Sequence, residues 1–278
     1  AAAASFVSIC YAHKFRGRTD TRTNNYIIAV GASGSGKSKI CDSALWLMSH
    51  APQKLRARLM GEMASSSGLV DELLARDGMA YAYIDEIGQF FRFARSENSS
   101  QYTKAIGAEM TKIFSKANEV YQTQAYSSAA KRPVREIQEP CLVIFGQSVP
   151  DRLYGSLTSA DFKDGFFNRF TLIEINDDER PVRNPDYKMP QDYYPKAIYD
   201  FWDQFDAWTS NEIMKVNRQD NLQGNPNTLL PVYTDAANKM LDDCFDYYQV
   251  TLPDSLDEKD MFREPLTRAY EQIEKYAL

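Results

Sequence analysis

The sequence predicts an α/β fold in which a mostly parallel central sheet is flanked by helices, with a further helical region at the C-terminal end. Two observations lead to this prediction. Four short apolar runs with the character of buried strands lie before residue 178, with helix-compatible segments between them. After residue 178 the composition changes to aromatic-rich segments with helical spacing. Strands that alternate with helices are typical of a parallel sheet.

The predicted elements follow one another in a simple order. The strands are expected at residues 25–30, 79–84, 141–146 and 170–175. The helices are expected at residues 37–49, 66–77, 101–118, 193–208, 234–248 and 259–277. Two β-like arms within residues 119–138 predict a hairpin, whose mixed polarity suggests weak anchoring to a core. We therefore expect an N-terminal linker or helical extension (1–24), a core (25–178) and a C-terminal helical region (179–278).

Composition limits the classes of protein that this chain can belong to. Of its 278 residues, 44% are hydrophobic and 25% charged, which is enough apolar material for a packed core. The longest apolar runs are far shorter than the roughly 20 residues of a membrane span, so we expect a soluble protein. The four cysteines form no CxxC pair, which makes a structural zinc site improbable. The net charge of -6 argues against a uniformly basic surface but permits a local basic track.

A glycine-rich segment follows the first predicted strand directly and precedes a predicted helix. It matches the pattern GxxxxGK[ST] and consists of Gly31, Ala32, Ser33, Gly34, Ser35, Gly36, Lys37 and Ser38. The glycines let the backbone wrap round a phosphate so that successive N–H groups point inward at a helix N-terminus. Lys37 brings a cation to the β- and γ-phosphates, and Ser38 offers a hydroxyl to Mg²⁺. The segment therefore predicts a P-loop that binds ATP with Mg²⁺.

An acidic pair follows the second predicted strand. Asp85 is expected to hold Mg²⁺, directly or through water, and Glu86 to orient and deprotonate the attacking water. The carboxyl ends of strands are where open α/β sheets place ligands. The alternative is an ordinary acidic pair at a strand end.

Three further polar residues are candidates for contact with the γ-phosphate. Gln147 and Ser148 follow the third predicted strand, where either side chain can act as a sensor between the two core strands. Arg169 precedes the fourth strand and is a candidate arginine finger, because a planar, permanently charged fork stabilises the transition state. A surface or interface salt bridge is the alternative for Arg169.

The predicted hairpin carries a cluster of basic residues. Lys131 and Arg132 lie near its tip and Arg135 follows closely. Cations placed in a channel can grip phosphates independently of base sequence, so these residues are candidates for binding nucleic acid, single-stranded DNA in particular. A solvated loop is the equally ordinary alternative.

Taken together, the order of the motifs resembles a family of ATPase domains in phage and mobile-element primase-helicases. It also resembles the AAA+ branch that contains superfamily 3 viral helicases, in which a β-hairpin precedes the sensor strand. The resemblance covers roughly residues 25–278, and its most specific carriers are the segments GQSVPDRLYGSL and GFFNRF. Many AAA+ relatives carry Asn or Thr at the sensor position, so the pair Gln147 and Ser148 departs from their pattern.

The resemblance implies an AAA+-like P-loop ATPase. It assigns nucleotide and metal roles to Lys37, Ser38, Asp85 and Glu86, and the finger role to Arg169 acting on a neighbouring subunit. It further implies a ring homo-oligomer, with a hexamer favoured, in the cytoplasm of a bacterial host cell.

Three functions fit these predictions. The first is an ATP-hydrolysing nucleic-acid translocase or helicase module of a phage or mobile-element replication protein. The second is a DNA-packaging or conjugative coupling motor, since such motors also pair a P-loop with Asp-Glu. The third is a regulatory ATPase switch without motor activity. An attached primase domain would favour the first, an attached nuclease the second, and nucleic-acid-stimulated turnover would count against the third.

Overall fold

The computed structural model describes residues 1–95, 101–124, 134–163, 165–175, 196–219, 228–257, 260, 265–266 and 268–278. The strands are β1 (Tyr26–Gly31), β2 (Met79–Ile84), β3 (Val120–Gln122), β4 (Glu136–Gln138), β5 (Cys141–Ser148) and β6 (Phe170–Ile175). The first helices are α1 (Ala2–Cys10), α2 (Lys37–His50), α3 (Gln53–Arg56), α4 (Ser66–Leu74), α5 (Ile87–Arg95) and α6 (Gln101–Ser115). The later ones are α7 (Pro150–Tyr154), α8 (Ser159–Lys163), the 3-10 helix η1 (Phe167–Arg169), α9 (Lys196–Gln219), α10 (Asp235–Phe245), the π-helix η3 (Asp246–Thr251), α11 (Leu252–Ser255) and α13 (Ala269–Ala277).

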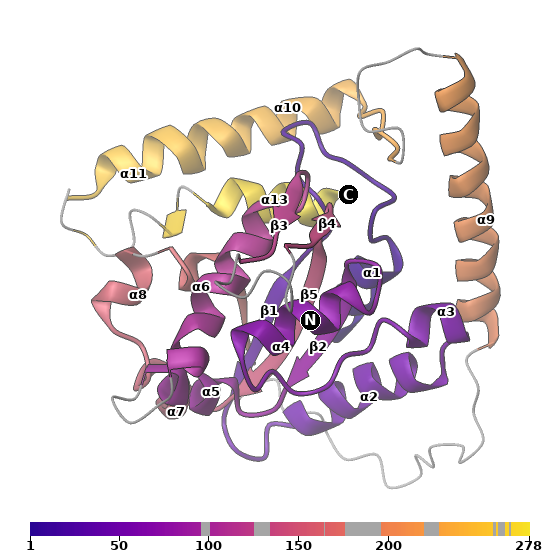
Figure 1. Cartoon of the computed structure of the whole chain (residues 1–278). Coiled ribbons are helices and arrows are strands. Elements are labelled where there is room, and N and C mark those ends of the chain that lie inside the picture. The colour runs from indigo at the N-terminus through magenta and orange to yellow at the C-terminus, as the bar shows by residue number, and fades with distance from the viewer. Residues whose placement is uncertain are drawn as a thin grey trace, which may run out of the picture.

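Four of these strands form one parallel sheet, in the order β2-β5-β1-β6 (Figure 1). The predicted α/β class with a parallel sheet flanked by helices is confirmed. Because β5 pairs with β2 on one side and with β1 on the other, it lies between the strand that precedes the glycine-rich segment and the strand that precedes Asp85. All four strands end at the same edge of the sheet, so the segments that follow them meet there.

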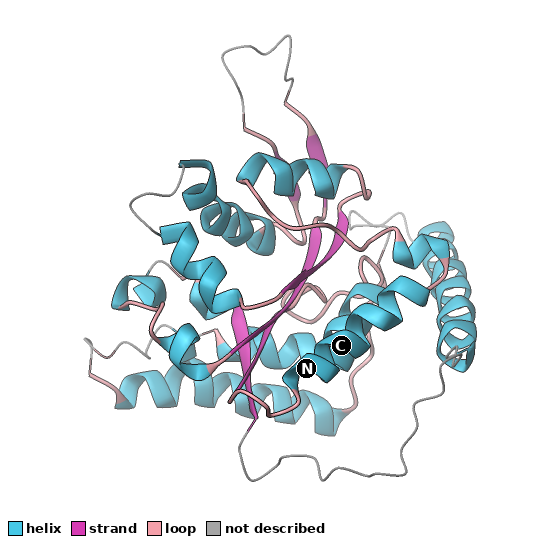
Figure 2. Ribbon diagram, turned by 90° about the horizontal axis from the view of Figure 1, so that it is seen from below, coloured by secondary structure: helices cyan, strands magenta, loops and turns pink. Residues whose placement is uncertain are grey.

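The sheet is covered on both faces, which explains its continuous apolar runs (Figure 2). Alternate residues of β1 enter two separate cores, with Ile28 on one face and Ile27 on the other. The first core is formed with α4, α5 and α6, and the second with α1, α2 and α9. Every residue of β1 and β5 is buried, as a central strand between two helical layers requires.

The antiparallel pair β3 and β4 forms the base of the predicted hairpin. Its tip, residues 125–133, lies outside the described residues. The prediction of weak anchoring is wrong for the base, since Tyr121 and Ile137 point inward and are buried in the first core. The Tyr121 hydroxyl also donates a hydrogen bond to the Glu109 carboxylate of α6. The alternating pattern therefore has one inward residue on each arm, which fastens the hairpin to the sheet.

The terminal segments pack back onto the core. On α1, the Ser5 hydroxyl shares a hydrogen bond of 2.9 Å with the Tyr81 hydroxyl of β2. On α9, the Tyr199 hydroxyl donates to the carbonyl of Leu47 on α2 (2.7 Å). On α13, the Gln272 amide donates to the carbonyl of Arg169 (3.2 Å). Helices from both ends of the chain therefore support the sheet.

Several predicted boundaries differ from the observed ones. β5 is two residues longer than predicted and contains Gln147 and Ser148, because it continues to pair with β1. Of the helix predicted at 259–277, α13 covers only residues 269–277, since Asp260 and Arg268 are not helical. The expected boundary near 178 falls among residues outside the described part of the chain. In the described residues, no helix has a stretch long and apolar enough to cross a membrane.

The stability of this fold is expected to fall in acid because of His13. The pKa of His13 is lowered from 6.5 to about 4, chiefly by burial and also by the nearby cations Arg58, Arg22 and Lys14, against a hydrogen bond to the Glu139 carbonyl that raises it. Between those pKa values the unfolded chain binds more protons than the folded one. The free energy of unfolding should therefore drop by roughly 3 kcal/mol as the pH falls from 6.5 to 4.

Urea unfolding at pH 7 and pH 4.5 tests this. The variant His13→Asn should lose less stability in acid than the parent, and asparagine tolerates the left-handed backbone of this position (φ 64°). His50→Asn is the matched control because His50 is exposed at the end of α2. An equal acid loss in the parent and in His13→Asn would contradict the assignment.

Candidate functional site

The glycine loop, residues 31–36, turns sharply from β1 into α2. Gly34 and Gly36 have φ values of 83° and 87°, in the left-handed region that favours glycine, and Gly36 caps α2. A side chain at Gly31 would lie 2.8 Å from the Ser35 hydroxyl and 3.1 Å from Ile175 of β6. The backbone therefore favours glycine at Gly34 and Gly36, and the neighbouring side chains leave little room for a larger residue at Gly31.

Lys37, the first residue of α2, folds back over the glycine loop. Its ammonium donates hydrogen bonds to the carbonyls of Gly31 (2.6 Å) and Ala32 (2.9 Å). The Ser35 hydroxyl is buried and, within the described part of the chain, has no hydrogen-bond partner. Ser33, Gly34 and Ser38 are exposed around these groups. A tethered cation, an unsatisfied hydroxyl and a helix N-terminus together suit an anion with several oxygens.

The acidic corner, Asp85 and Glu86, follows β2 at the same edge of the sheet. Asp85 is exposed, and Glu86 has a left-handed backbone with φ 50°. The Glu86 carbonyl accepts a hydrogen bond from the backbone N–H of Gln89 (2.7 Å), so the turn leads straight into α5. A non-glycine residue in this region costs on the order of 1 kcal/mol or more, and such strain gathers at functional sites. A cavity of about 260 Å³ opens beside both carboxylates.

Gln147 connects the acidic corner with α2. Its amide nitrogen donates to Asp85 Oδ1 (2.7 Å) and to the Tyr83 hydroxyl (3.0 Å). Its amide oxygen accepts from the Cys41 thiol (3.2 Å), one helical turn after Lys37. Burial raises the pKa of Cys41 to about 11, so the thiol stays protonated and able to donate near neutral pH. One side chain of β5 is therefore bonded to residues of α2 and to residues at the end of β2.

Ser148 points to the opposite face of the sheet from Gln147. Its hydroxyl lies 2.8 Å from the position that a side chain at Gly88 would take, next to α5. It is fully buried and has no hydrogen-bond partner among the described residues. Of the two sensor candidates, Gln147 is the one in contact with Asp85.

Cys41 and Tyr83 were missed in the sequence analysis. Both had a detectable signal. Tyr83 and Asp85 share one face of β2 by the period of two that strands follow, and Cys41 lies one turn after Lys37 on the same side of α2. Polar side chains on those faces are placed to meet between β2 and α2, where both contact Gln147.

Arg169 lies at the amino edge of the sheet, at the opposite end from the glycine loop. It directly precedes β6, whose first residue pairs with Tyr26 at the start of β1. Its side chain is buried and donates to the Gly165 carbonyl and to the Ser115 hydroxyl (2.8 Å). The finger role stays a prediction, and it requires the guanidinium to leave these contacts.

The predicted nucleic-acid residues are only partly described. Lys131 and Arg132 lie outside the described residues. Arg135 is exposed at the start of the second arm, and its guanidinium forms an ion pair with Asp71 of α4. Its backbone N–H donates to the Thr123 hydroxyl (2.8 Å), which prolongs the hairpin beyond β3 and β4.

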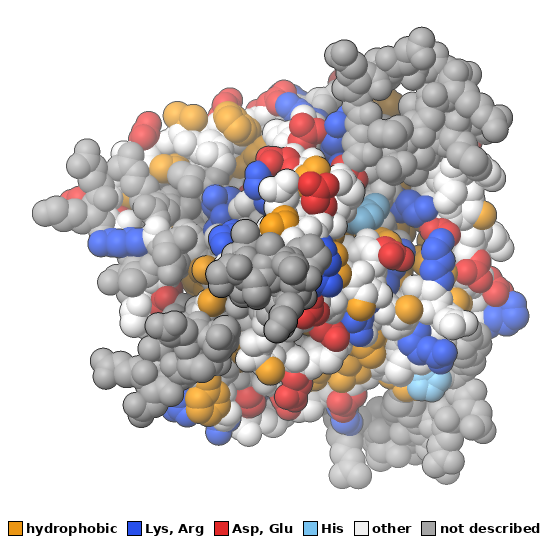
Figure 3. Space-filling view, viewed as in Figure 1, with side chains coloured by type: hydrophobic (Ala, Val, Ile, Leu, Met, Phe, Trp, Pro, Cys, Tyr) orange, Lys and Arg blue, Asp and Glu red, His pale blue; other side chains and the backbone are white. Residues whose placement is uncertain are grey.

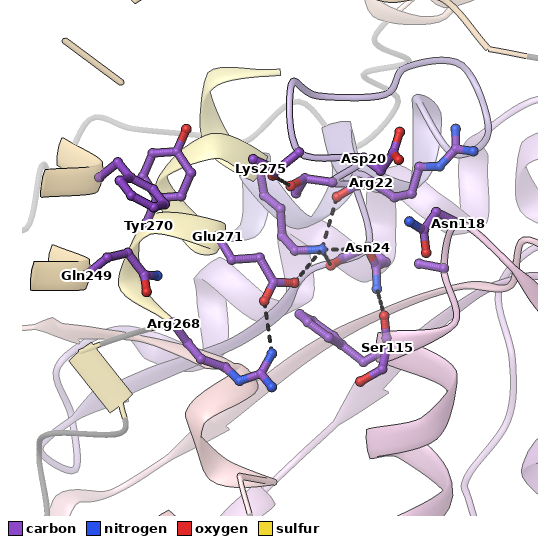
Figure 4. Close-up of a pocket in the computed structure, with 15 residues that line it drawn as sticks. Asp20, Arg22, Asn24, Ser115, Asn118, Gln249, Arg268, Tyr270, Glu271 and Lys275 are labelled. Carbon is purple, nitrogen blue, oxygen red and sulfur yellow. Dashed lines mark hydrogen bonds and ion pairs between the residues drawn. The ribbon is translucent and has the colours of Figure 1, made fainter. Parts of the chain in front are cut away.

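A larger polar hollow of about 580 Å³ lies at the amino edge (Figure 4). The ammonium of Lys275 donates to Asn24 Oδ1 (2.6 Å) and to the Asn24 carbonyl (3.1 Å), and it lies 4.3 Å from the ring centroid of Phe114. Burial lowers the pKa of Lys275 to about 8. Arg268 pairs with Glu271 at 3.1 Å. The Lys275 contacts join α13 to the segment before β1, whereas the pair of Arg268 and Glu271 lies within the first turn of α13.

No model of a protein family matches the chain, and no curated protein matches it.

Proposed function

We propose that this chain is a magnesium-dependent ATPase of the P-loop class with an AAA+-like arrangement. One observation carries the proposal. The glycine loop with its tethered lysine and the acidic corner lie at one edge of a parallel sheet, and Gln147 bonds both to Asp85 and to Cys41 of α2, the helix that follows the glycine loop. Phosphate, metal and water therefore have separate groups to bind to at a single place.

The glycine loop would bind the phosphates of ATP. Its N–H groups and the start of α2 offer a positive field to an anion. Lys37 would exchange its two carbonyl contacts for phosphate oxygens, which are stronger partners because they are charged. A phosphate oxygen would also satisfy the buried Ser35 hydroxyl.

Ser38 and Asp85 would hold Mg²⁺. Both offer oxygen atoms, which are the ligands that Mg²⁺ prefers, and both are exposed at this edge. Gln147 holds Asp85 Oδ1, which orients the carboxylate. When bound, the metal neutralises negative charge on the β- and γ-phosphates.

Glu86 would act as the general base. It is adjacent to Asp85 in a turn with a left-handed backbone at Glu86. Glu86 would accept a proton from a water molecule that attacks the γ-phosphorus, while the bond from that phosphorus to the bridging oxygen breaks and ADP leaves.

The proposal includes a nucleic-acid translocase acting as a ring. It is supported by the way in which the hairpin joins the sheet. Gly78, just before β2, lies against Ile137 of β4, since a side chain at Gly78 would be 2.8 Å from the Ile137 side chain. The backbone N–H of Cys141 on β5 donates to the Gly78 carbonyl (2.7 Å). Movement of β2 or β5 during hydrolysis would therefore reach the hairpin. On the face seen in Figure 3, acidic and basic side chains are interspersed, so contact with phosphates would depend on local groups.

Two variants separate binding from chemistry. Lys37→Ala should weaken ATP binding by about 10- to 100-fold, because a charged partner of the phosphates is lost. Glu86→Gln should bind ATP at least as tightly as the parent and lower turnover by about 100-fold or more. Nucleotide affinity and steady-state hydrolysis are measured side by side. Glu271→Gln is the control, since Glu271 also pairs with an arginine, at 3.1 Å, but lies at the amino edge. Parental turnover in Glu86→Gln would contradict the base assignment.

A second experiment addresses the hairpin tip. Lys131→Ala combined with Arg132→Ala should weaken binding of single-stranded DNA and lower the salt slope of binding by about 1 for each phosphate contact removed. Stimulation of hydrolysis by DNA should be lost, while basal hydrolysis stays near the parental rate. The control removes two exposed lysines elsewhere, Lys196 of α9 and Lys239 of α10. Unchanged affinity and salt slope in the hairpin variant would favour a regulatory ATPase switch.

A further inference from the structure

An arginine that the sequence analysis did not single out lies next to the acidic corner. Arg152 is on α7, which follows β5 after one intervening residue and also contacts β1. Its guanidinium Nη1 lies 3.2 Å from Glu86 Oε2. Arg152 therefore stands at the carboxyl edge, between the strand that ends at the glycine loop and the strand that ends at the acidic corner.

Gly88 keeps Arg152 in this place. A side chain at Gly88 would lie 2.8 Å from the Arg152 carbonyl oxygen and 2.9 Å from its carbonyl carbon. The first turn of α5 and the backbone of α7 are thus in direct contact, as the neighbouring ribbons in Figure 1 show. Because Glu86 begins that turn of α5, the close approach holds Arg152 within reach of it.

The pair between Arg152 and Glu86 is suited to exchange. The two side chains are 52% and 34% exposed, but the Glu86 Oε2 atom is itself buried and accepts no hydrogen bond from any described residue. The contact with Arg152 is therefore an ion pair alone, and such a pair between partly exposed side chains adds little stability. A phosphate offers a guanidinium more negative charge than one carboxylate and can accept two parallel hydrogen bonds from it. A nucleotide at the glycine loop would therefore compete with Glu86 for Arg152.

Arg169 has the opposite surroundings. It is 5% exposed, held by the Gly165 carbonyl and Ser115, and lies at the amino edge of the sheet. Arg152 has an exposed guanidinium at the edge where the phosphates would bind. Within one chain, Arg152 is therefore better placed than Arg169 to contact them.

We propose that Arg152 contacts the terminal phosphate of ATP bound in the same chain and thereby distinguishes ATP from ADP. This inference rests on the proposed ATPase function. Arg152 leaves Glu86 when the terminal phosphate is present and returns to it after that phosphate departs. Glu86 is consequently free to accept a proton from water only while there is a phosphate to transfer.

The test compares the parent with Arg152→Ala and Arg152→Lys. The affinities for ADP and for a non-hydrolysable ATP analogue are measured with Mg²⁺, together with the rate of ATP hydrolysis. In Arg152→Ala, ADP affinity should stay within about twofold, affinity for the ATP analogue should fall about tenfold, and turnover should fall about 100-fold or more. Arg152→Lys should lie between, because it keeps the charge but not the fork. Arg18→Ala is the control, since Arg18 forms a surface pair with Asp242.

A further arm uses Glu86→Gln, which removes the competing carboxylate. It should raise affinity for the ATP analogue and leave ADP affinity unchanged, a result that a merely structural pair would not produce.

Faster hydrolysis in Arg152→Ala would show that the arginine only restrains Glu86 and would overturn the inference. An equal loss of ADP and ATP-analogue affinity would also overturn it. A parent that binds neither nucleotide would overturn the proposed function and this inference with it, whereas normal parental turnover with an unchanged Arg152→Ala overturns this inference alone.

Discussion

The position of β5 between β1 and β2 is the constraint on which the rest of the site depends. Parallel pairing on both sides places the last residues of β5 beside the end of β1 and just beyond the end of β2. The glycine loop follows β1 and the acidic corner follows β2. These two strands are not paired with each other, because β5 lies between them. A residue at the end of β5 is the shortest bridge between them, and Gln147 occupies that place. The separation of β1 from β2 by one strand also leaves room at the edge for a ligand.

The contacts of Gln147 suit a buried polar residue. Its amide bonds to side chains from α2 and β2, so both ends of the group have partners. The Cys41 thiol and the Tyr83 hydroxyl are themselves tied to Gln147, and burial keeps both groups protonated near neutral pH by raising their pKa values. A network of this kind resists rearrangement, since breaking one contact leaves a polar group without a partner. Asp85 is the member that faces solvent, and so it is the one available to a metal.

The sheet was predictable from sequence because its strands are apolar runs, and the two central strands β1 and β5 are buried on both faces. A continuous apolar run is unambiguous in such a setting, and the bounds of β2 and β6 agree with those expected. The sharp turn of the glycine loop was also predictable, because glycines at positions 34 and 36 permit the left-handed backbone that both residues adopt.

The remainder of the site depends on contacts between distant segments. The strand order decides whether Gln147 or Ser148 faces Asp85, and nothing local in the segment does so. Arg169 carries a plausible sequence context for a finger, yet its burial follows from where α6 ends. Arg152 lies within the segment GQSVPDRLYGSL, but that pattern does not predict its neighbour, because its place beside Glu86 is set by the contact of α7 with Gly88. Such features appear only when the chain is folded.

The central claim is that the glycine loop and the acidic corner form a single site for a nucleotide and its metal. The most direct test replaces Mg²⁺ with Mn²⁺ and follows its binding by electron paramagnetic resonance, with and without ADP. The account predicts that ADP strengthens Mn²⁺ binding in the parent, and that this strengthening is lost in Asp85→Asn and in Ser38→Ala alike. Mn²⁺ binding that is independent of ADP, or that survives unchanged in both variants, would contradict it.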